Sequence, residues 1–172
     1  MSPHPKAGHI RLIAFDVDGI MTDGRLYYGN EGEVMKAFDV QDGLGIKLAQ
    51  DAGIETAIIT SRRSRIVEHR AGDLGIRHLF QGVHDKWEAL RGLCVSLRLE
   101  PSAAAFMGDD LVDLQPMRHC GFSVTVPTAA ARVRHIADYI TAADAGRGAV
   151  RECCELLIAS RTPAEPHVGT TG

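Results

Sequence analysis

Two clusters of acidic residues, each placed directly after an apolar run, are the residues of this sequence best placed to do chemistry. The apolar runs are residues 10–15 and 103–107. If both are buried parallel strands, their carboxyl ends meet at one edge of a sheet and bring about five carboxylates together. So much negative charge in one place needs a cation. The clusters consist of Asp16 and Asp18, and of Asp109, Asp110 and Asp113.

A hard divalent cation suits these clusters. Carboxylate oxygens, with water in the remaining positions, suit Mg²⁺ better than Zn²⁺, and the sequence has no set of His and Cys residues at the spacing of a zinc site. A carboxylate that binds Mg²⁺ and faces a phosphate can attack phosphorus, because the metal offsets the repulsion between the two anions. The clusters therefore predict phosphoryl transfer through a phosphoaspartate intermediate. Seen separately, each cluster would also fit a turn or a helix N-terminus.

Thr60 and Lys86 fit the same edge of the sheet. Thr60 ends the apolar run 56–59, where its hydroxyl could donate to a phosphoryl oxygen, and Lys86 could neutralise the phosphate. A single lysine at a helix start is usually a solvated surface charge. The order D-x-D, Thr, Lys, G-D-D-x-x-D along the chain is what favours a shared site for all of them.

Short apolar runs alternate with stretches of helical length, which predicts an α/β fold with a parallel sheet covered by helices. Residues 24–39 break this alternation with two short runs around Gly29 and Gly32, and they predict a β-hairpin directly after the first strand. Such a hairpin would overhang the carboxyl edge of the sheet, where α/β proteins bind ligands. The expected strands are residues 10–15, 56–59, 103–107 and 122–126, and the expected helices are residues 43–51, 64–74, 85–97, 111–119 and 150–159.

The bulk composition indicates a single soluble domain. A chain of 172 residues is too short for two ordinary domains, so we expect one domain over residues 9–160, with mobile ends at residues 1–8 and 161–172. The net charge of −3 gives no basic excess for binding nucleic acid, and no apolar run is long enough to cross a bilayer. The four cysteines lack C-x-x-C spacing and are interpreted as reduced thiols of a cytoplasmic protein.

With these motifs in order, residues 10 to about 160 resemble the phosphatases of the haloacid dehalogenase superfamily, which have a Rossmann-like sheet. Within that superfamily, the sequence resembles the phosphatases that act on 3-deoxy-D-manno-octulosonate 8-phosphate. The resemblance implies a Mg²⁺-dependent phosphoric monoester hydrolase of lipopolysaccharide synthesis, with a hairpin flap and no large cap domain. The matching segments are residues 16–24 (DVDGIMTDG), Lys36-Ala37-Phe38, Asp42-Gly43, Gly108-Asp109-Asp110 and residues 146–152 (GRGAVRE).

The resemblance also implies a role for each acidic residue. Asp16 would be the nucleophile and a Mg²⁺ ligand. Asp18 would be the general acid and base, and its backbone carbonyl would also bind Mg²⁺. Asp109 would be the remaining protein ligand, and Asp110 and Asp113 would lie beside the ligands and orient them.

Other residues would bind the substrate. By the same resemblance, Thr60 and Lys86 would hold the phosphoryl group, and Arg62 and Arg147 would meet the sugar acid beside Ser61. Ser61 stands where the family usually has Gly, and so does Ala145. Relatives are homotetramers in which the segment around Arg147 reaches a neighbour's site, so the expected partners are a small sugar-acid phosphate and further copies of the chain.

Three other functions remain open from the sequence. A phosphatase for a related nine-carbon sugar acid would fit, although relatives of that kind tend to carry Glu in place of Arg62. A phospho-accepting receiver domain also combines an acidic cluster with Thr and Lys, but its motifs come in a different order. A non-catalytic domain that stimulates a sugar-activating enzyme is disfavoured, because every expected catalytic position is filled.

Overall fold

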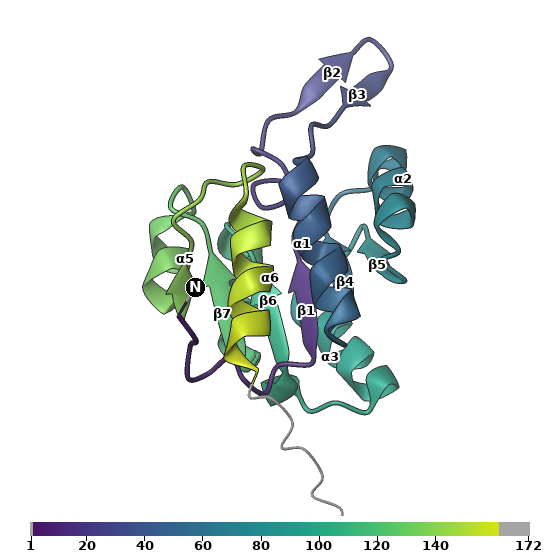
Figure 1. The fold of residues 1–172 in the computed structure, drawn as a ribbon. Helices are drawn as coiled ribbons and strands as arrows, with labels where there is room; N and C mark the ends of the chain where they lie inside the picture. Colours follow the sequence, from purple (N-terminus) through teal and green to yellow (C-terminus); the bar gives the residue numbers. More distant parts are fainter. Residues whose placement is uncertain (1, 162–172) are drawn as a thin grey trace, which may run out of the picture.

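A parallel sheet forms the centre of the computed structural model, which describes residues 2–161 (Figure 1). Within these residues the sheet has six strands in the order β5-β4-β1-β6-β7-β8. Every residue of β1, β6 and β7 is buried, which is why these strands are continuous apolar runs in the sequence. The strands are β1 (Leu12–Phe15), β4 (Glu55–Thr60), β5 (His78–Gln81), β6 (Ala104–Met107), β7 (Phe122–Thr125) and β8 (Tyr139–Ile140).

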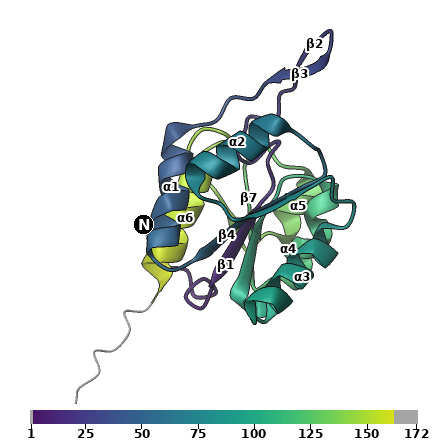
Figure 2. The same cartoon turned by 90° about the vertical axis from the view of Figure 1, so that its right-hand side faces the viewer.

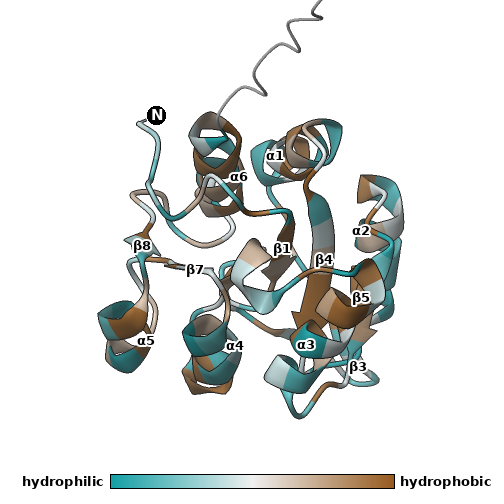
Figure 3. Ribbon diagram, turned by 90° about the horizontal axis from the view of Figure 1, so that it is seen from below, coloured by the Kyte–Doolittle hydropathy of each residue, from teal (hydrophilic) through white to brown (hydrophobic). Residues whose placement is uncertain are grey.

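Helices cover both faces of the sheet, as Figures 2 and 3 show. One face carries α1 (Val40–Asp51), α2 (Arg65–Leu74) and α6 (Ala149–Ser160), and the other carries α3 (Lys86–Leu97), α4 (Leu114–His119) and α5 (Ala131–Ile136). The chain leaves β1 toward β4 and β5 on one side and later returns to β6 on the other. The carboxyl ends of β1 and β6 therefore lie at the switch point of the sheet, where a crevice opens.

An antiparallel hairpin follows β1 and projects beyond the carboxyl edge of the sheet (Figures 1 and 2). It consists of β2 (Tyr27–Gly29) and β3 (Gly32–Met35). Gly32 has φ +115°, a conformation that other residues rarely adopt. The predicted α/β fold with a hairpin flap is confirmed, and residues 2–161 contain no large cap domain.

Several element boundaries differ from the prediction. The short elements β5, β8 and α5 were not predicted at all. Helix α1 begins three residues before the expected start, because the Asp39 carboxylate caps it by accepting from the backbone N–H groups of Gln41 at 2.6 Å and Asp42 at 3.3 Å. The expected helix 111–119 is divided into a 3₁₀ turn, Leu111–Asp113, and α4, because the Asp113 side chain turns back onto the backbone before it.

The N-terminal segment lies against the sheet and α6. Ala7 is fully buried, and the backbone N–H of His4 donates to Ser160 Oγ at 2.8 Å. The mobility expected for residues 1–8 stays a prediction. The mobile tail was expected over residues 161–172, and residues 162–172 lie outside the described part of the chain. Among residues 2–161, none of the helices has both the length and the apolar character needed to cross a membrane.

Candidate active site

Lys86 lies buried between two carboxylates at the switch point of the sheet. It begins α3, whose N-terminus is capped by Asp85. Its Nζ is 2.8 Å from Asp16 Oδ2 and 2.7 Å from Asp113 Oδ1, and its side chain is 1% exposed. Burial alone would lower the pKa of Lys86, but the two carboxylates raise it, so the ammonium is charged. Lys86 thus contacts a carboxylate of each acidic cluster, and its binding of a phosphoryl group stays a prediction.

Asp16 is held at the end of β1 by the backbone around it. Its N–H donates to the carbonyl of Met107 on β6 at 3.0 Å, and its Oδ1 accepts from the N–H of Val17 at 2.7 Å. Burial and the neighbouring Asp113 carboxylate raise the pKa of Asp16 above its usual value, against the opposing effect of Lys86. Gly19 has φ +89°, and a Cβ there would overlap the Asp109 carboxylate. The glycine therefore lets the loop after β1 approach Asp109.

Asp113 is fully buried and orders the loop after β6. Its Oδ2 accepts from the N–H groups of Asp109 at 3.0 Å and Asp110 at 3.1 Å, while its Oδ1 accepts from Lys86. This arrangement leaves Asp109 facing Asp16. Burial and then the charges of Asp113 and Asp16 raise the pKa of Asp109 to about 7.

The acidic cluster fits a divalent cation. Oxygens of Asp16, Asp109 and Asp113 all lie within 4.8 Å of one another. Asp113 already uses both oxygens in hydrogen bonds, whereas Asp109 Oδ1 is buried and has no hydrogen-bond partner among residues 2–161. An unpaired buried carboxylate oxygen beside a second carboxylate suits a hard cation with oxygen ligands. Asp16 and Asp109 are therefore the side chains best placed to bind it.

A cavity of about 210 Å³ opens above these carboxylates. It brings together all the predicted catalytic and substrate residues except Arg147, whereas the fully buried Asp113 does not line it. Thr60 is buried at the end of β4, as expected for a phosphoryl-binding hydroxyl. The lining residues are Asp16, Asp18, Thr60, Ser61, Arg62, Lys86, Asp109, Asp110 and Val112.

Arg147 lies outside this cavity and lines a separate hollow beside Asp23 and Arg25. The N–H of the preceding residue, Gly146, donates to the carbonyl of Ile20 at 3.1 Å, so the segment packs on the loop after β1. Gly146 has φ +62°, and a Cβ there would collide with the backbone of residues 22–23. Within its own chain, Arg147 does not reach the cavity that holds Asp16.

The two departures from the family pattern are compatible with the backbone. Among residues 2–161, Arg98 is the only residue other than glycine with a positive φ. Ser61 and Ala145 therefore occupy conformations open to any residue, and neither position requires glycine for its dihedral angles.

Sequence reasoning missed the role of two charged residues of the hairpin segment, Glu33 and Lys36. Lys36 contacts Asp18 Oδ1 and lies 2.9 Å from Glu33 Oε1, and its side chain is 1% exposed. Ser64 Oγ donates to the other Glu33 oxygen. Lys36 was part of a matching segment but had no role assigned. A lysine on a short, otherwise exposed hairpin gives no signal in the sequence that it is buried.

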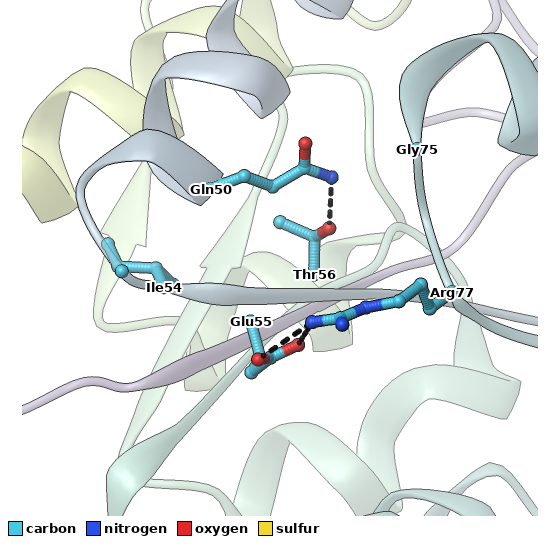
Figure 4. Close-up of a pocket in the computed structure, with 7 residues that line it drawn as sticks. Gln50, Ile54, Glu55, Thr56, Gly75 and Arg77 are labelled. Atoms are coloured by element: carbon cyan, nitrogen blue, oxygen red, sulfur yellow. Dashed lines mark hydrogen bonds and ion pairs between the residues drawn. The ribbon is translucent and has the colours of Figure 1, made fainter.

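A second hollow lies at the opposite, amino-terminal end of β4 (Figure 4). Its polar groups are paired with one another: Gln50 Nε2 donates to Thr56 Oγ1 at 2.8 Å, and Arg77 Nη2 lies 3.2 Å from Glu55 Oε1. None of the predicted site residues lines this hollow. The carboxyl edge of the sheet is therefore the candidate active site.

Comparisons with known proteins agree with this placement. The haloacid dehalogenase-like hydrolase family matches residues 78–152. The 3-deoxy-D-manno-octulosonate 8-phosphate phosphatase KdsC of Yersinia pestis is 45% identical over 97% of this chain and 88% of its own length. The KdsC protein of Escherichia coli K12 is 48% identical over 89% of this chain and 81% of its own. The chain belongs to the 3-deoxy-D-manno-octulosonate 8-phosphate phosphatase family.

Solved structures of this family have the same fold. The phosphatase of Moraxella catarrhalis, crystallised with a magnesium ion, a phosphate ion and a KDO molecule, is 49% identical and superposes with a TM-score of 0.88 over 91% of this chain and 90% of its own. The cobalt-bound phosphatase of Haemophilus influenzae is 37% identical, with a TM-score of 0.88 over 91% of each chain. The assignment from the sequence to this family, and to the phosphoric monoester hydrolases, is confirmed.

We predict that the metal-free protein loses stability as the pH rises from 5 to 8. The folded pKa of Asp109, about 7, exceeds the ordinary 3.8, so the folded state binds more protons than the unfolded state between these values, and the free energy of unfolding falls. Asp109→Asn should remove about 2 to 3 kcal/mol of this fall in the free energy of unfolding. Urea unfolding in a chelator, at several pH values, measures it.

The exposed Asp51 at the end of α1 supplies the control, because Asp51→Asn should leave the pH dependence as in the unaltered protein. Subtracting the pH dependence of one protein from that of another removes the contributions that the other carboxylates make to the free energy of unfolding. An unchanged slope in Asp109→Asn would show that Asp109 is not the group with the raised pKa.

Proposed function

We propose that this chain hydrolyses 3-deoxy-D-manno-octulosonate 8-phosphate to the free sugar acid and phosphate, with Mg²⁺ as its cofactor. The main support is Lys86, buried between Asp16 and Asp113 in a cavity at the switch point of the sheet. The relatives named above act on this substrate, and one of them was crystallised with Mg²⁺, phosphate and KDO. The same proposal places the reaction in lipopolysaccharide synthesis and in the cytoplasm, which fits the free thiols of Cys94, Cys120, Cys153 and Cys154.

In the first step, an Asp16 oxygen forms a bond to phosphorus while the bond from phosphorus to the sugar oxygen breaks. Asp18, which lines the same cavity, donates a proton to the departing sugar oxygen. It then takes a proton from water, whose oxygen attacks phosphorus and releases Asp16. Thr60 and Lys86 hold the phosphoryl oxygens. Asp16, Asp109 and the backbone carbonyl of Asp18 would hold Mg²⁺, which would supply positive charge that offsets the repulsion between nucleophile and phosphate.

We predict that Asp16→Asn abolishes phosphate release while the protein remains folded, because the amide keeps the shape of the side chain but cannot act as the nucleophile. Asp18→Asn should be nearly as damaging, because the amide cannot exchange the proton. Phosphate release with the sugar phosphate as substrate measures both effects, and circular dichroism checks the fold. A chelator should silence the unaltered protein and Mg²⁺ should restore it. Normal turnover by Asp16→Asn would refute the mechanism.

Arg62 is the proposed determinant of substrate choice. Its side chain is 40% exposed at the mouth of the cavity, where Nη2 donates to the Tyr28 hydroxyl at 2.7 Å. A guanidinium here can donate charge-assisted hydrogen bonds to a sugar carboxylate or hydroxyl beyond the phosphoryl group. This placement favours the eight-carbon substrate over the nine-carbon one, for which relatives tend to carry Glu.

We predict that Arg62→Glu lowers kcat/KM for the octulosonate phosphate by roughly ten- to a thousandfold, because one or two charge-assisted bonds are lost. Hydrolysis of a small generic phosphate ester, which makes no sugar contact, should change much less. Arg63→Glu makes the same charge change at the exposed neighbouring residue and should affect neither substrate strongly. Equal losses on both substrates would show that Arg62 acts on the phosphoryl group or through Asp18, 3.5 Å from its Nε, and not on the sugar.

A homotetramer would complete the open site. The hairpin exposes apolar side chains beside the cavity, among them Tyr28 at 60% and Val34 at 62%. Arg147 lies outside the cavity of its own chain, which fits a residue that acts in a neighbour's site. We therefore propose that the hairpins pack together and that Arg147 reaches the sugar acid bound by another subunit.

We predict a tetrameric mass in solution and a raised KM for Arg147→Ala, because a closing contact to the substrate is lost. Complementation is the sharper measurement. Tetramers assembled from Arg147→Ala and the inactive Asp16→Asn should regain a low KM at their mixed sites, where one subunit supplies Asp16 and the other Arg147. Mixtures of Asp16→Asn with Asp18→Asn are the control and should stay inactive. An active monomer would contradict the proposal.

A further inference from the structure

Four charged side chains alternate in sign around a closed ring that joins the hairpin to the cavity. Lys36 Nζ contacts Asp18 Oδ1 and lies 2.9 Å from Glu33 Oε1. Arg62 completes the ring, with Nη2 3.9 Å from the same Glu33 oxygen and Nε 3.5 Å from Asp18 Oδ2. Each carboxylate therefore faces both cations, and the ring is neutral when both carboxylates are ionised.

Glu33 is held in this ring more firmly than its position on a hairpin suggests. Its side chain is 14% exposed, whereas that of the next residue, Val34, points to solvent. Its second oxygen, Oε2, accepts from Ser64 Oγ, so the carboxylate ties β3 to the N-terminus of α2. Burial alone would raise the pKa of Glu33, but the hydrogen bonds from Ser64 and Lys36 and the charges of Lys36 and Arg62 lower it. The group is thus an anion at neutral pH.

The charge balance shows what Glu33 does for its neighbours. A lysine as buried as Lys36 needs anionic partners, and it has two here, Asp18 and Glu33. Without the Glu33 charge, both cations of the ring would have Asp18 as their remaining carboxylate partner. Asp18 would then be drawn toward the hairpin and bound more tightly, away from the geometry that proton transfer at the cavity requires.

We propose that Glu33 is a positioning residue that acts through Lys36 to hold the Asp18 carboxylate in its working orientation, an inference that rests on the proposed phosphatase activity. The hairpin thereby contributes to the chemistry of its own chain and not only to an interface. Because Asp18 serves every phosphate ester, the effect extends to substrates that never touch Arg62.

The test compares Glu33→Gln with Glu31→Gln. Both variants remove one negative charge from the hairpin, but Glu31 is exposed. Glutamine keeps the size of Glu33 and can still accept from Ser64, so the fold should be retained. We expect Glu33→Gln to lower kcat about tenfold for both the octulosonate phosphate and a small generic phosphate ester, with KM for the ester and the melting temperature little changed. Glu31→Gln should match the unaltered protein.

A double-mutant cycle tests the route through Lys36. In a Lys36→Met background, Glu33→Gln should cost much less than the tenfold seen alone, because the cation that transmits its effect has gone. Fully additive losses would overturn the inference, as would a Glu33→Gln variant as active as Glu31→Gln, or a loss of kcat that merely follows a fall in melting temperature. An unaltered protein that releases no phosphate from either ester would refute the proposed function itself, and this inference with it.

Discussion

The buried ammonium of Lys86 is the interaction on which the candidate site depends. It lies between Asp16 and Asp113, and all three side chains are nearly or fully removed from water. Removing one partner of such a buried ion pair typically costs about 3 to 5 kcal/mol, because the other charge is left without compensation. One lysine cannot balance Asp16, Asp109 and Asp113 together. The remaining negative charge is why the structure suits a divalent cation beside Asp109.

The backbone around Lys86 lets the carboxylates of the acidic cluster lie close together. Asp16 and Asp109 follow neighbouring strands at the switch point, and the segment after each strand supplies a carboxylate to Lys86. Gly19 gives the Asp109 carboxylate room, and a Cβ at Gly108 would lie 2.5 Å from Asp113 Cβ. Side chains at either glycine would push the carboxylates apart. The acidic cluster therefore depends on the strand order and on the two glycines, Gly19 and Gly108, as much as on the aspartates.

The sequence predicted those parts of the fold whose burial produces an unbroken run of apolar residues. Strands β1, β6 and β7 are buried along their whole length, so each is an unbroken apolar run. Strand β5 is only half-buried, and β8 has two residues, so neither contains such a run. The site residues likewise divide into those that a sequence pattern locates and those that depend on the tertiary fold. Asp16, Thr60, Lys86 and Asp109 lie within or next to predictable elements. The pairing of Glu33 with Ser64 instead depends on where the hairpin lies relative to the N-terminus of α2.

The hairpin has two different faces, one that contacts α2 and one that exposes apolar side chains. Toward α2, Arg70 stacks over the Phe38 ring at 5.5 Å and donates to the carbonyl of Asp39 at 3.0 Å, while Ser64 donates to Glu33. These contacts attach the hairpin and the segment that follows it to α2 at two points. Beyond them, the apolar side chains of the hairpin have little to pack against among residues 2–161. A two-stranded hairpin is marginally stable alone, so these contacts with α2 fix its direction before any partner binds. The apolar surface is then presented at a fixed angle to the cavity, and docking of a partner there need not cost the ordering of a free loop.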